Sequence, residues 1–310
     1  MRKSKLFTYL LLILSVIFWG LSFIMTKELF LTEEHMSVTL LIFLRLAIAS
    51  AVMLPTMALA RKLPRLRKGD LKWFLRLTLC EPFFYHLCET TGLQLVSGSL
   101  ASMVIATIPL FVPFGMWVAY RERLHPLMLL GVALSLSGVA LTLLGGEGFS
   151  GNLRGLLFLA GAVGIAVVYT LLLIKVVDHY NPLAITTWQN FIGLLYFLPL
   201  VLTMDRANLV QLSFSPRMLG LLLTLGIACS TLAYAFYNYG VRRLGASQAC
   251  IFNNAIPAFS LVAAVLIGQE DFSWSKAVGI LVVIGGVVVA QLAPSRRQGG
   301  GGPDSELTRS

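Results

Sequence analysis

The sequence predicts an all-α integral membrane protein with ten transmembrane helices, arranged as two inverted five-helix repeats. Three observations carry this prediction. The 310-residue chain is 57% hydrophobic and only 12% charged, whereas soluble domains carry about 25% charged residues. Its apolar residues fall in long runs of the length that crosses a bilayer. A stretch of the first half also recurs 148 positions later in the chain.

The repeat is clearest between residues 97–142 and 245–290, which align without a gap and are identical at nine of 46 positions. Apolar stretches resemble one another by composition, but a proline, a carboxylate and two glycines rarely align by chance. Such similarity indicates an internal duplication. We interpret residues 1–148 and 149–292 as the two five-helix units and 293–310 as a disordered cytoplasmic tail. The informative identities are Pro109 with Pro257, Glu122 with Glu270, Gly131 with Gly279, and Gly138 with Gly286.

The first apolar run, Leu6–Met25, follows a short basic segment. A signal peptide is the alternative, but the run is longer than a signal core, and Lys27 and Glu28 stand where a cleavage site would follow. The run is therefore predicted to be the first transmembrane helix. The other nine are predicted at 37–60, 73–95, 100–120, 126–144, 155–177, 183–203, 218–239, 246–268 and 274–292. Strands are not expected, because these runs lack an alternating pattern.

Loop charges set the orientation. With a cytoplasmic N-terminus, the inner loops hold 18 lysines and arginines and the outer loops hold five. The positive-inside rule then predicts a multi-pass plasma-membrane protein with both termini in the cytoplasm. Because five is odd, the second unit must enter the membrane upside down relative to the first. Inverted repeats are a recurrent build of secondary transporters, with the substrate site near the midplane between the repeats.

Polar residues inside the third predicted helix are candidates for that site. Glu81, Tyr85 and Glu89 are spaced four apart and so share one face, and His86 lies three residues before Glu89. Ionisable groups within a span are costly and mark substrate paths or buried partners. Arg45 lies at a depth that allows an ion pair with Glu89, which is the structural alternative. A transport role for at least one of the two glutamates is favoured.

The second half carries a different polar set. For its tyrosines, ordinary helix packing is the alternative to lining a cavity, and for a tryptophan of the first helix the alternative is an interfacial or packing position. Two adjacent asparagines point about 100° apart, so each needs its own partner. These candidates for substrate binding are Gln189, Tyr234, Tyr237, Asn238, Asn253, Asn254 and Trp19.

Other repeated residues are interpreted structurally. Pro109 and Pro257 lie inside the fourth and ninth predicted helices, where each would free a backbone carbonyl at a packing kink or a gating hinge. Glu122 and Glu270 end the same spans, so capping or a contact between the halves is favoured over substrate binding. Small residues of the fifth and tenth helices predict close helix packing. They are Gly131, Ser135, Gly138, Gly279 and Gly286.

Several segments resemble a known family. YRERLHP and GQEDFSW, which each close a proline-containing span, resemble the repeat of the EamA family of the drug/metabolite transporter superfamily. FWGLSFIMTK, FLRLAIAS and LCETTGLQLVSGSLASM resemble its first four helices. The resemblance covers about residues 6–292 and implies ten helices, no ATP hydrolysis, and movement of small metabolites, often outward.

The function predicted is therefore a secondary transporter, with export favoured, of small metabolites such as amino acids or amphipathic amines, working by alternating access. A polytopic membrane enzyme is one alternative, but the sequence has no HExxH or GxSxG motif. A channel or scaffold is another, but a channel would favour a ring of like residues. The absence of a Walker motif excludes an ATP-driven pump unless a partner supplies the ATPase.

The expected partners are a small-molecule metabolite and the lipid bilayer. No nucleic acid is expected, because the net charge of +10 lies in short clusters between apolar runs. No cofactor or metal is expected, since the four cysteines lie in apolar spans without CxxC spacing. The chain is expected to be a monomer or a loose homodimer.

Overall fold

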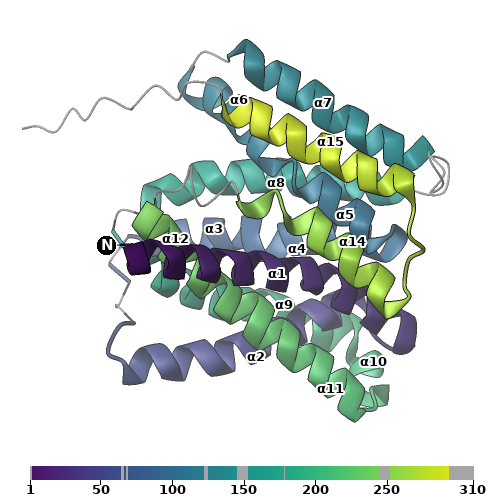
Figure 1. Cartoon of the computed structure of the whole chain (residues 1–310). Helices are drawn as coiled ribbons and strands as arrows, with labels where there is room; N and C mark the ends of the chain where they lie inside the picture. The colour runs from purple at the N-terminus through teal and green to yellow at the C-terminus, as the bar shows by residue number, and fades with distance from the viewer. Residues whose placement is uncertain are drawn as a thin grey trace, which may run out of the picture.

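The structure is a computed structural model that describes residues 2–63, 66–67, 69–121, 125–144, 153–177, 179–244 and 252–292. Within these ranges all of the regular secondary structure is helical (Figure 1). The predicted tail, 293–310, lies outside them. Six helices are long and apolar enough to cross a membrane, and three further apolar helices are shorter. The protein is thus a multi-pass membrane protein, while the crossing of all ten predicted spans stays a prediction.

The first half is helical where spans were predicted, with two interruptions. The third span is broken near Glu81, and the fourth is split at Ala106 and Thr107. The elements are α1 (Arg2–Thr32), α2 (Val38–Leu59), α3 (Leu71–Thr78), η1 (Leu79–Phe84), α4 (Tyr85–Leu95), α5 (Gly98–Ile105), α6 (Ile108–Tyr120) and α7 (Pro126–Thr142).

The second half repeats this pattern. Its eighth span is continuous through a wider-turned segment, η3, and the described part of its ninth span is a helix that begins next to Pro257. The elements are α8 (Leu153–Val177), α9 (Pro182–Met204), α10 (Arg206–Gln211), α11 (Pro216–Leu223), η3 (Thr224–Leu232), α12 (Ala233–Leu244), α14 (Ile256–Ile267) and α15 (Trp274–Gln291).

Side-chain caps fix where several helices begin. Ser37, Ser97, Asn181 and Ser215 precede α2, α5, α9 and α11, and the side-chain oxygen of each accepts a backbone N–H of the first turn. Such a cap contributes about 1 kcal/mol. These residues therefore begin the helices at the ends of the polar loops that separate the predicted apolar runs.

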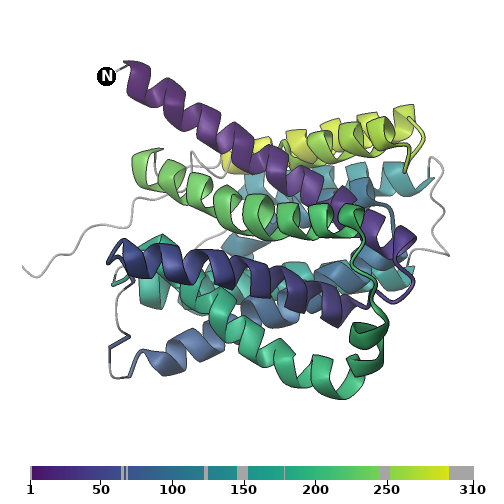
Figure 2. The same ribbon diagram turned by 90° about the horizontal axis from the view of Figure 1, so that it is seen from below.

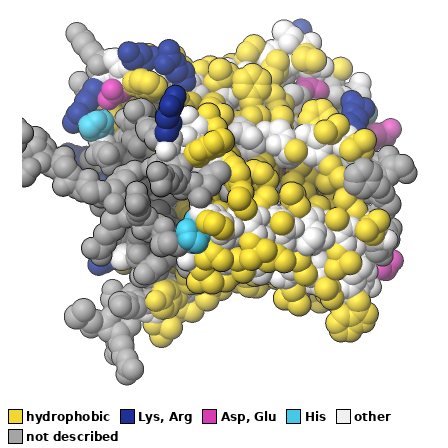
Figure 3. Space-filling view, turned by 90° about the horizontal axis from the view of Figure 1, so that it is seen from above, with side chains coloured by type: hydrophobic (Ala, Val, Ile, Leu, Met, Phe, Trp, Pro, Cys, Tyr) yellow, Lys and Arg dark blue, Asp and Glu magenta, His cyan; other side chains and the backbone are white. Residues whose placement is uncertain are grey.

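The surface has the distribution that a bilayer requires. Hydrophobic side chains cover the middle of the molecule, and charged side chains gather toward its two ends (Figure 3). The helices run mainly from one end to the other (Figure 1). The apolar band therefore lies across the helix axes, where it would face the hydrocarbon core.

The contact between α7 and α15 confirms the predicted close packing of small residues. A methyl group on Gly138 would lie 2.6 Å from the carbonyl oxygen of Gly279, and one on Gly286 would lie 2.6 Å from that of Gly131. Residue numbers rise along α7 as they fall along α15, so the two helices run antiparallel. The contact is also reciprocal, because Gly131 and Gly138 correspond to Gly279 and Gly286 at the offset of 148.

Helix α1 of the first half packs against helices of the second half along one buried side. It lies beside both α12 and α14 (Figures 1 and 2). Equivalent spans of the two halves also meet: α2 of the second span packs on α9 of the seventh, and α5 of the fourth span packs on α14 of the ninth. The largest buried apolar cluster joins α1, α4, α5, α8 and α14. Both halves thus contribute to one continuous interior.

Candidate functional site

Glu81 interrupts its helix. Its backbone, with φ −141° and ψ 121°, is extended between α3 and α4, and Pro82 follows it, which disfavours the helical conformation at the preceding residue. The interruption leaves the Glu81 carbonyl oxygen free to bond elsewhere, and Gln189 Nε2 of α9 donates to it at 2.9 Å. The second half therefore binds the backbone of Glu81.

The second half also binds the Glu81 carboxylate. The Tyr234 hydroxyl of α12 donates to Glu81 Oε1 at 3.2 Å. The Trp19 ring of α1 lies 5.1 Å from the ring centres of both Tyr234 and Tyr237. Edge-on aromatic contacts of this kind contribute about 0.5–1.5 kcal/mol each beyond area burial. The structure thus brings Glu81 together with three predicted aromatic residues.

One face of α4 carries the other ionisable residues. The Tyr85 hydroxyl lies 3.4 Å from Glu89 Oε1, and His86 Nδ1 lies 3.5 Å from Glu89 Oε2. The side chains of His86 and Glu89 are only 12% and 15% exposed. Glu81 interacts electrostatically with both His86 and Glu89. Two carboxylates and one imidazole therefore lie close together in the same part of the protein.

Tyr169 of α8 also lies next to these residues, although the sequence did not indicate it as a candidate for substrate binding. Its hydroxyl donates to Gln189 Oε1 at 3.4 Å. Tyr169 is a single tyrosine in an apolar span, so no local signal separates it from a packing residue. We name the whole group the central cluster. Its members are Trp19, Glu81, Tyr85, His86, Glu89, Tyr169, Gln189, Tyr234 and Tyr237.

Arg45 is placed differently from the sequence expectation. Its Nε donates to Ser230 Oγ of η3 at 2.6 Å, whereas the Glu89 carboxylate lies next to the Tyr85 hydroxyl and His86 Nδ1. The ion pair between Arg45 and Glu89 that their depths allow does not form among the described residues. Ser230 was not expected as the partner of Arg45, because it lies 185 residues away in sequence and serine is an ordinary small residue of helices. Arg45 still interacts electrostatically with Tyr234 of the central cluster.

The two asparagines lie where the ninth span is interrupted. Asn253 and Asn254 precede α14, and Asn254 is 4% exposed. The oxygen of Asn253 and both amide atoms of Asn254 are buried without a hydrogen-bond partner in the described part of the chain. Asn238, the remaining asparagine candidate, lies in α12, but its side chain lies outside the described residues.

The prolines of the fourth and ninth spans are not helix-interior kinks, so that expectation is wrong. Pro109 and Pro257 each lie in the first turn of a new helix, α6 and α14 respectively. Proline is favoured there because first-turn N–H groups have no partner within the helix. Each proline therefore restarts a helix after a short break, at equivalent places in the two halves.

Of the two repeated glutamates, Glu122 lies outside the described residues. Glu270 accepts hydrogen bonds from Ser99 N at 3.0 Å and Ser99 Oγ at 2.5 Å, and it pairs with Lys276 at 2.8 Å. It therefore caps the first turn of α5 from the second half. At the same turn, Lys27 Nζ of α1 donates to carbonyl oxygens at the end of α4, with distances of 2.8–3.1 Å.

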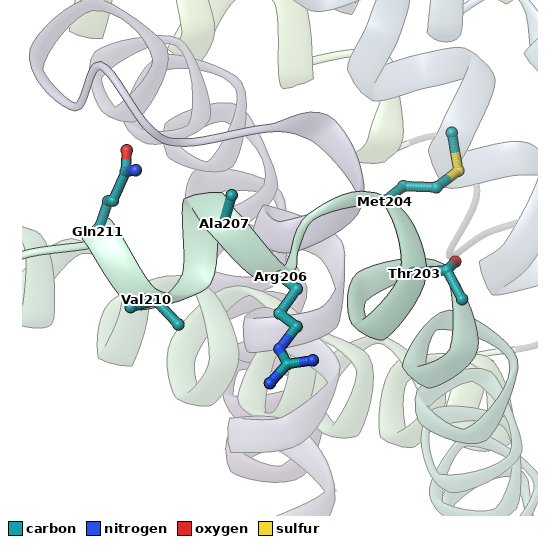
Figure 4. A pocket seen from close by; sticks show the side chains of 6 residues that line it. All are labelled: Thr203, Met204, Arg206, Ala207, Val210 and Gln211. Atoms are coloured by element: carbon teal, nitrogen blue, oxygen red, sulfur yellow. The ribbon is translucent and has the colours of Figure 1, made fainter.

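A surface hollow lies far along the chain from these groups, at the turn between α9 and α10 (Figure 4). Arg206 and Gln211 at its rim point in opposite directions (Figure 4). Polar groups that bind one ligand converge, so this hollow is not the candidate site. In the part of the chain that the structure describes, no three His, Cys, Asp or Glu side chains gather as metal ligands.

Comparison with known proteins gives one family. The EamA-like transporter family matches the chain twice, at residues 6–144 and 153–291. The "Uncharacterized transporter YetK" of Bacillus subtilis is 28% identical over 93% of this chain and 87% of its own length. An "Uncharacterized transporter" of Archaeoglobus fulgidus is 25% identical over 91% of this chain and 97% of its own. A solved crystal structure aligns with 90% of this chain and 99% of its own, with a TM-score of 0.63 at 20% identity, which shows a shared fold.

Proposed function

The chain belongs to the EamA-like transporter family, and we propose that this membrane transporter moves small metabolites such as amino acids or amphipathic amines outward, without ATP, by alternating access. The observation that supports this most is the central cluster. It joins two carboxylates of the first half to Tyr234 and Gln189 of the second, at an interrupted helix. Costly ionisable groups inside a span are expected at a substrate path.

The chemistry of the central cluster suits a cargo with an amino group. Glu81 and Glu89 can pair with a cation, and the faces of Trp19, Tyr234 and Tyr237 can stabilise it by cation–π attraction. Glu81 now accepts from Tyr234, a bond that a cationic group could replace with a stronger, charge-assisted one. Binding would thereby exchange a contact between the halves for a contact with the cargo.

Alternating access requires two halves that can rock against each other. We propose ten spans in two inverted units, 1–148 and 149–292, with both termini in the cytoplasm of a plasma-membrane monomer or loose homodimer. The antiparallel, reciprocal contact of α7 with α15 supports an inverted arrangement. The meeting of α2 with α9 and of α5 with α14 supports an axis between the halves.

Contacts near Glu270 support a closed outer end in this conformation. Glu270 and Lys27 hold the α4–α5 turn, and we name Lys27, Ser99 and Glu270 the outer latch. Two further contacts tie the halves at the same end. Gln269 Nε2 donates to the Ile24 carbonyl oxygen at 3.2 Å, and Arg217 pairs with Glu28. Outward release of a cargo would need these contacts to open.

The proposal is tested by transport in proteoliposomes with a pool of metabolites, read by mass spectrometry. We expect uptake of one or more amines or amino acids, and counterflow against preloaded cargo, which a channel does not give. Glu81→Gln and Glu89→Gln should each lower this transport at least about tenfold, the effect of losing one charge-assisted contact. Glu34→Gln is the matched control, since Glu34 is exposed.

Two results would contradict the proposal. If both glutamine variants transport as well as the Glu34→Gln control across pH 5–8, the carboxylates are structural. If the pool is chemically altered rather than moved, the enzyme alternative holds. Detergent-purified protein of each variant should elute as a single species, so that a loss of transport is not a loss of folded protein.

A further inference from the structure

The strongest feature that the proposed transport site leaves unused is the asparagine pair before α14. Asn254 is 4% exposed, yet neither its Nδ2 nor its Oδ1 has a hydrogen-bond partner among the described residues. The Oδ1 of Asn253 is also buried without one. Folded proteins pair nearly all buried polar atoms, so a carboxamide with both functions unpaired needs an explanation.

The position of the pair points to a ligand. Asn254 directly precedes Ala255, the N-cap of α14, whose side chain cannot accept from the first turn. Pro257 removes one first-turn donor, and those that remain carry the partial positive charge of the helix start. Transporters commonly hold acceptor groups of their substrates at helices that begin inside a membrane span, and here unpaired side-chain amides lie beside such a helix start.

The pair is also close to the central cluster. A methyl group on Gly20 of α1 would lie 3.2 Å from both the Ile256 carbonyl oxygen and the Ser260 nitrogen. The backbone of α1 therefore lies directly against the first turn of α14. Trp19, the neighbour of Gly20, contacts Tyr234 and Tyr237. The start of α14 and the aromatic residues of the central cluster therefore lie against neighbouring residues of α1.

The unpaired atoms define the chemistry of the missing partner. Asn254 lacks a donor and an acceptor, and Asn253 lacks a donor. A carboxylate offers only acceptors, and an ammonium offers only donors, so each would leave a buried atom unpaired. A primary amide offers both side by side, because one of its N–H groups lies on the same edge as its carbonyl oxygen, whereas the two groups of a trans secondary amide point in opposite directions. We infer that Asn253 and Asn254 bind an amide group of the cargo.

This inference rests on the proposed function and narrows its substrate class. The carboxylates of the central cluster take the amine of the cargo, and the asparagine pair takes an amide. The cargo is then an amine that carries a primary amide, as in amino-acid amides. An amine without an amide would bind at one of the two positions only.

Binding of three simple probes to the purified full-length protein tests the assignment. Phenethylamine carries only an amine, hydrocinnamamide only an amide, and hydrocinnamate only a carboxylate, all on the same phenylethyl group. We expect Asn254→Leu to weaken hydrocinnamamide about tenfold, the factor for one net hydrogen bond, and to leave phenethylamine unchanged. Glu81→Gln should do the reverse, so a failure of the amine site and a failure of the amide site are distinguishable.

Two further variants keep the test decisive. Asn254→Asp preserves the shape but removes the donors, and it replaces the leucine variant if that protein does not fold. Ser50→Ala removes another buried, unpartnered oxygen, on α2, and should change the binding of none of the probes. The inference is overturned if hydrocinnamamide does not bind the wild type. It is also overturned if hydrocinnamate is the probe that Asn254→Leu weakens, or if that variant binds all three probes as the wild type does.

Discussion

Glu270→Gln should open the outer end of the protein. The carboxylate of Glu270 is bound by Ser99 N, Ser99 Oγ and Lys276, and its side chain is only 7% exposed. A glutamine has the same shape but lacks the charge that strengthens these bonds. Because Glu270 lies in the second half and Ser99 in the first, the substitution weakens a contact between the halves, which in the proposed alternating access breaks when the outer end opens.

The expected size follows from the contacts. Hydrogen bonds to charged groups contribute about 1.5–3 kcal/mol, against about 1 kcal/mol for neutral pairs. Losing the charge in this buried site should therefore cost the closed state about 2 kcal/mol, which shifts the open-to-closed ratio roughly 30-fold. A state populated at about 1% would reach about a fifth of the molecules. Ser99→Ala removes only the Oγ bond and leaves the Glu270 charge with Ser99 N and Lys276, so it should shift the ratio less than Glu270→Gln, which weakens all of these bonds.

Cysteine labelling measures this shift. Ser102 lies one turn deeper in α5, is fully buried, and donates to the Ser99 carbonyl oxygen. In a chain without the native cysteines, Ser102→Cys should react with an impermeant maleimide from outside only when the outer end opens. Glu270→Gln should raise the labelling rate roughly 30-fold. Asp271→Asn, an equal charge change at the exposed neighbouring residue, should raise it less than about twofold.

The reasoning is refuted if Glu270→Gln labels no faster than Asp271→Asn while both proteins remain folded. It is equally refuted if Ser99→Ala labels faster than Glu270→Gln, since the order of the two follows from the charge. A rise from the cytoplasmic side alone would show that the latch closes the opposite end from the one proposed.

Two further predictions concern the scaffold. Gly286→Ala places a methyl group 2.6 Å from the Gly131 carbonyl oxygen and should lower the thermal unfolding midpoint, at a cost of about 1–3 kcal/mol. Gly285→Ala, which meets nothing within 4 Å, is its control, and equal midpoints for the two variants would contradict the close α7–α15 contact. For topology, reporter fusions at residues 65 and 304 should report the cytoplasm, and fusions at 148 and 208 the outside. Two disagreements among these four would overturn the inverted arrangement.

Helix positions were predictable from sequence because each depends on a local run of apolar residues. The interruptions were only partly predictable. Pro109 and Pro257 were visible as helix breakers, but the sequence does not say whether a proline kinks a helix or starts a new one. The structure starts new helices at Pro109 and Pro257, because a first-turn proline loses no intrahelical hydrogen bond. Glu81 is extended for a related reason, since it precedes Pro82.

The ionisable residues of the candidate site were predictable from the sequence, whereas Tyr169 and Ser230 were not. Glu81, Glu89 and His86 stood out because an ionisable residue inside an apolar span needs a reason to be there. Tyr169 and Ser230 did not, because a tyrosine or a serine is common in any helix. Their partners are also 20 and 185 residues away, and a single sequence holds no signal for contacts between those helices.

The two halves are alike in their scaffold and different at the central cluster. The glycine contacts of α7 and α15 are reciprocal, so each half presents equivalent glycines to the other at this contact. At the central cluster, equivalent positions of the two halves carry different residues. At the offset of 148, Glu81 corresponds to the buried Cys229, and Glu89 to Tyr237. In the proposed alternating access, a shared scaffold would let the same rocking motion expose either end, whereas the proposed cargo with two distinct ends would need two unlike surfaces. The duplication therefore fits the proposed motion, and its divergence at these positions fits the proposed cargo.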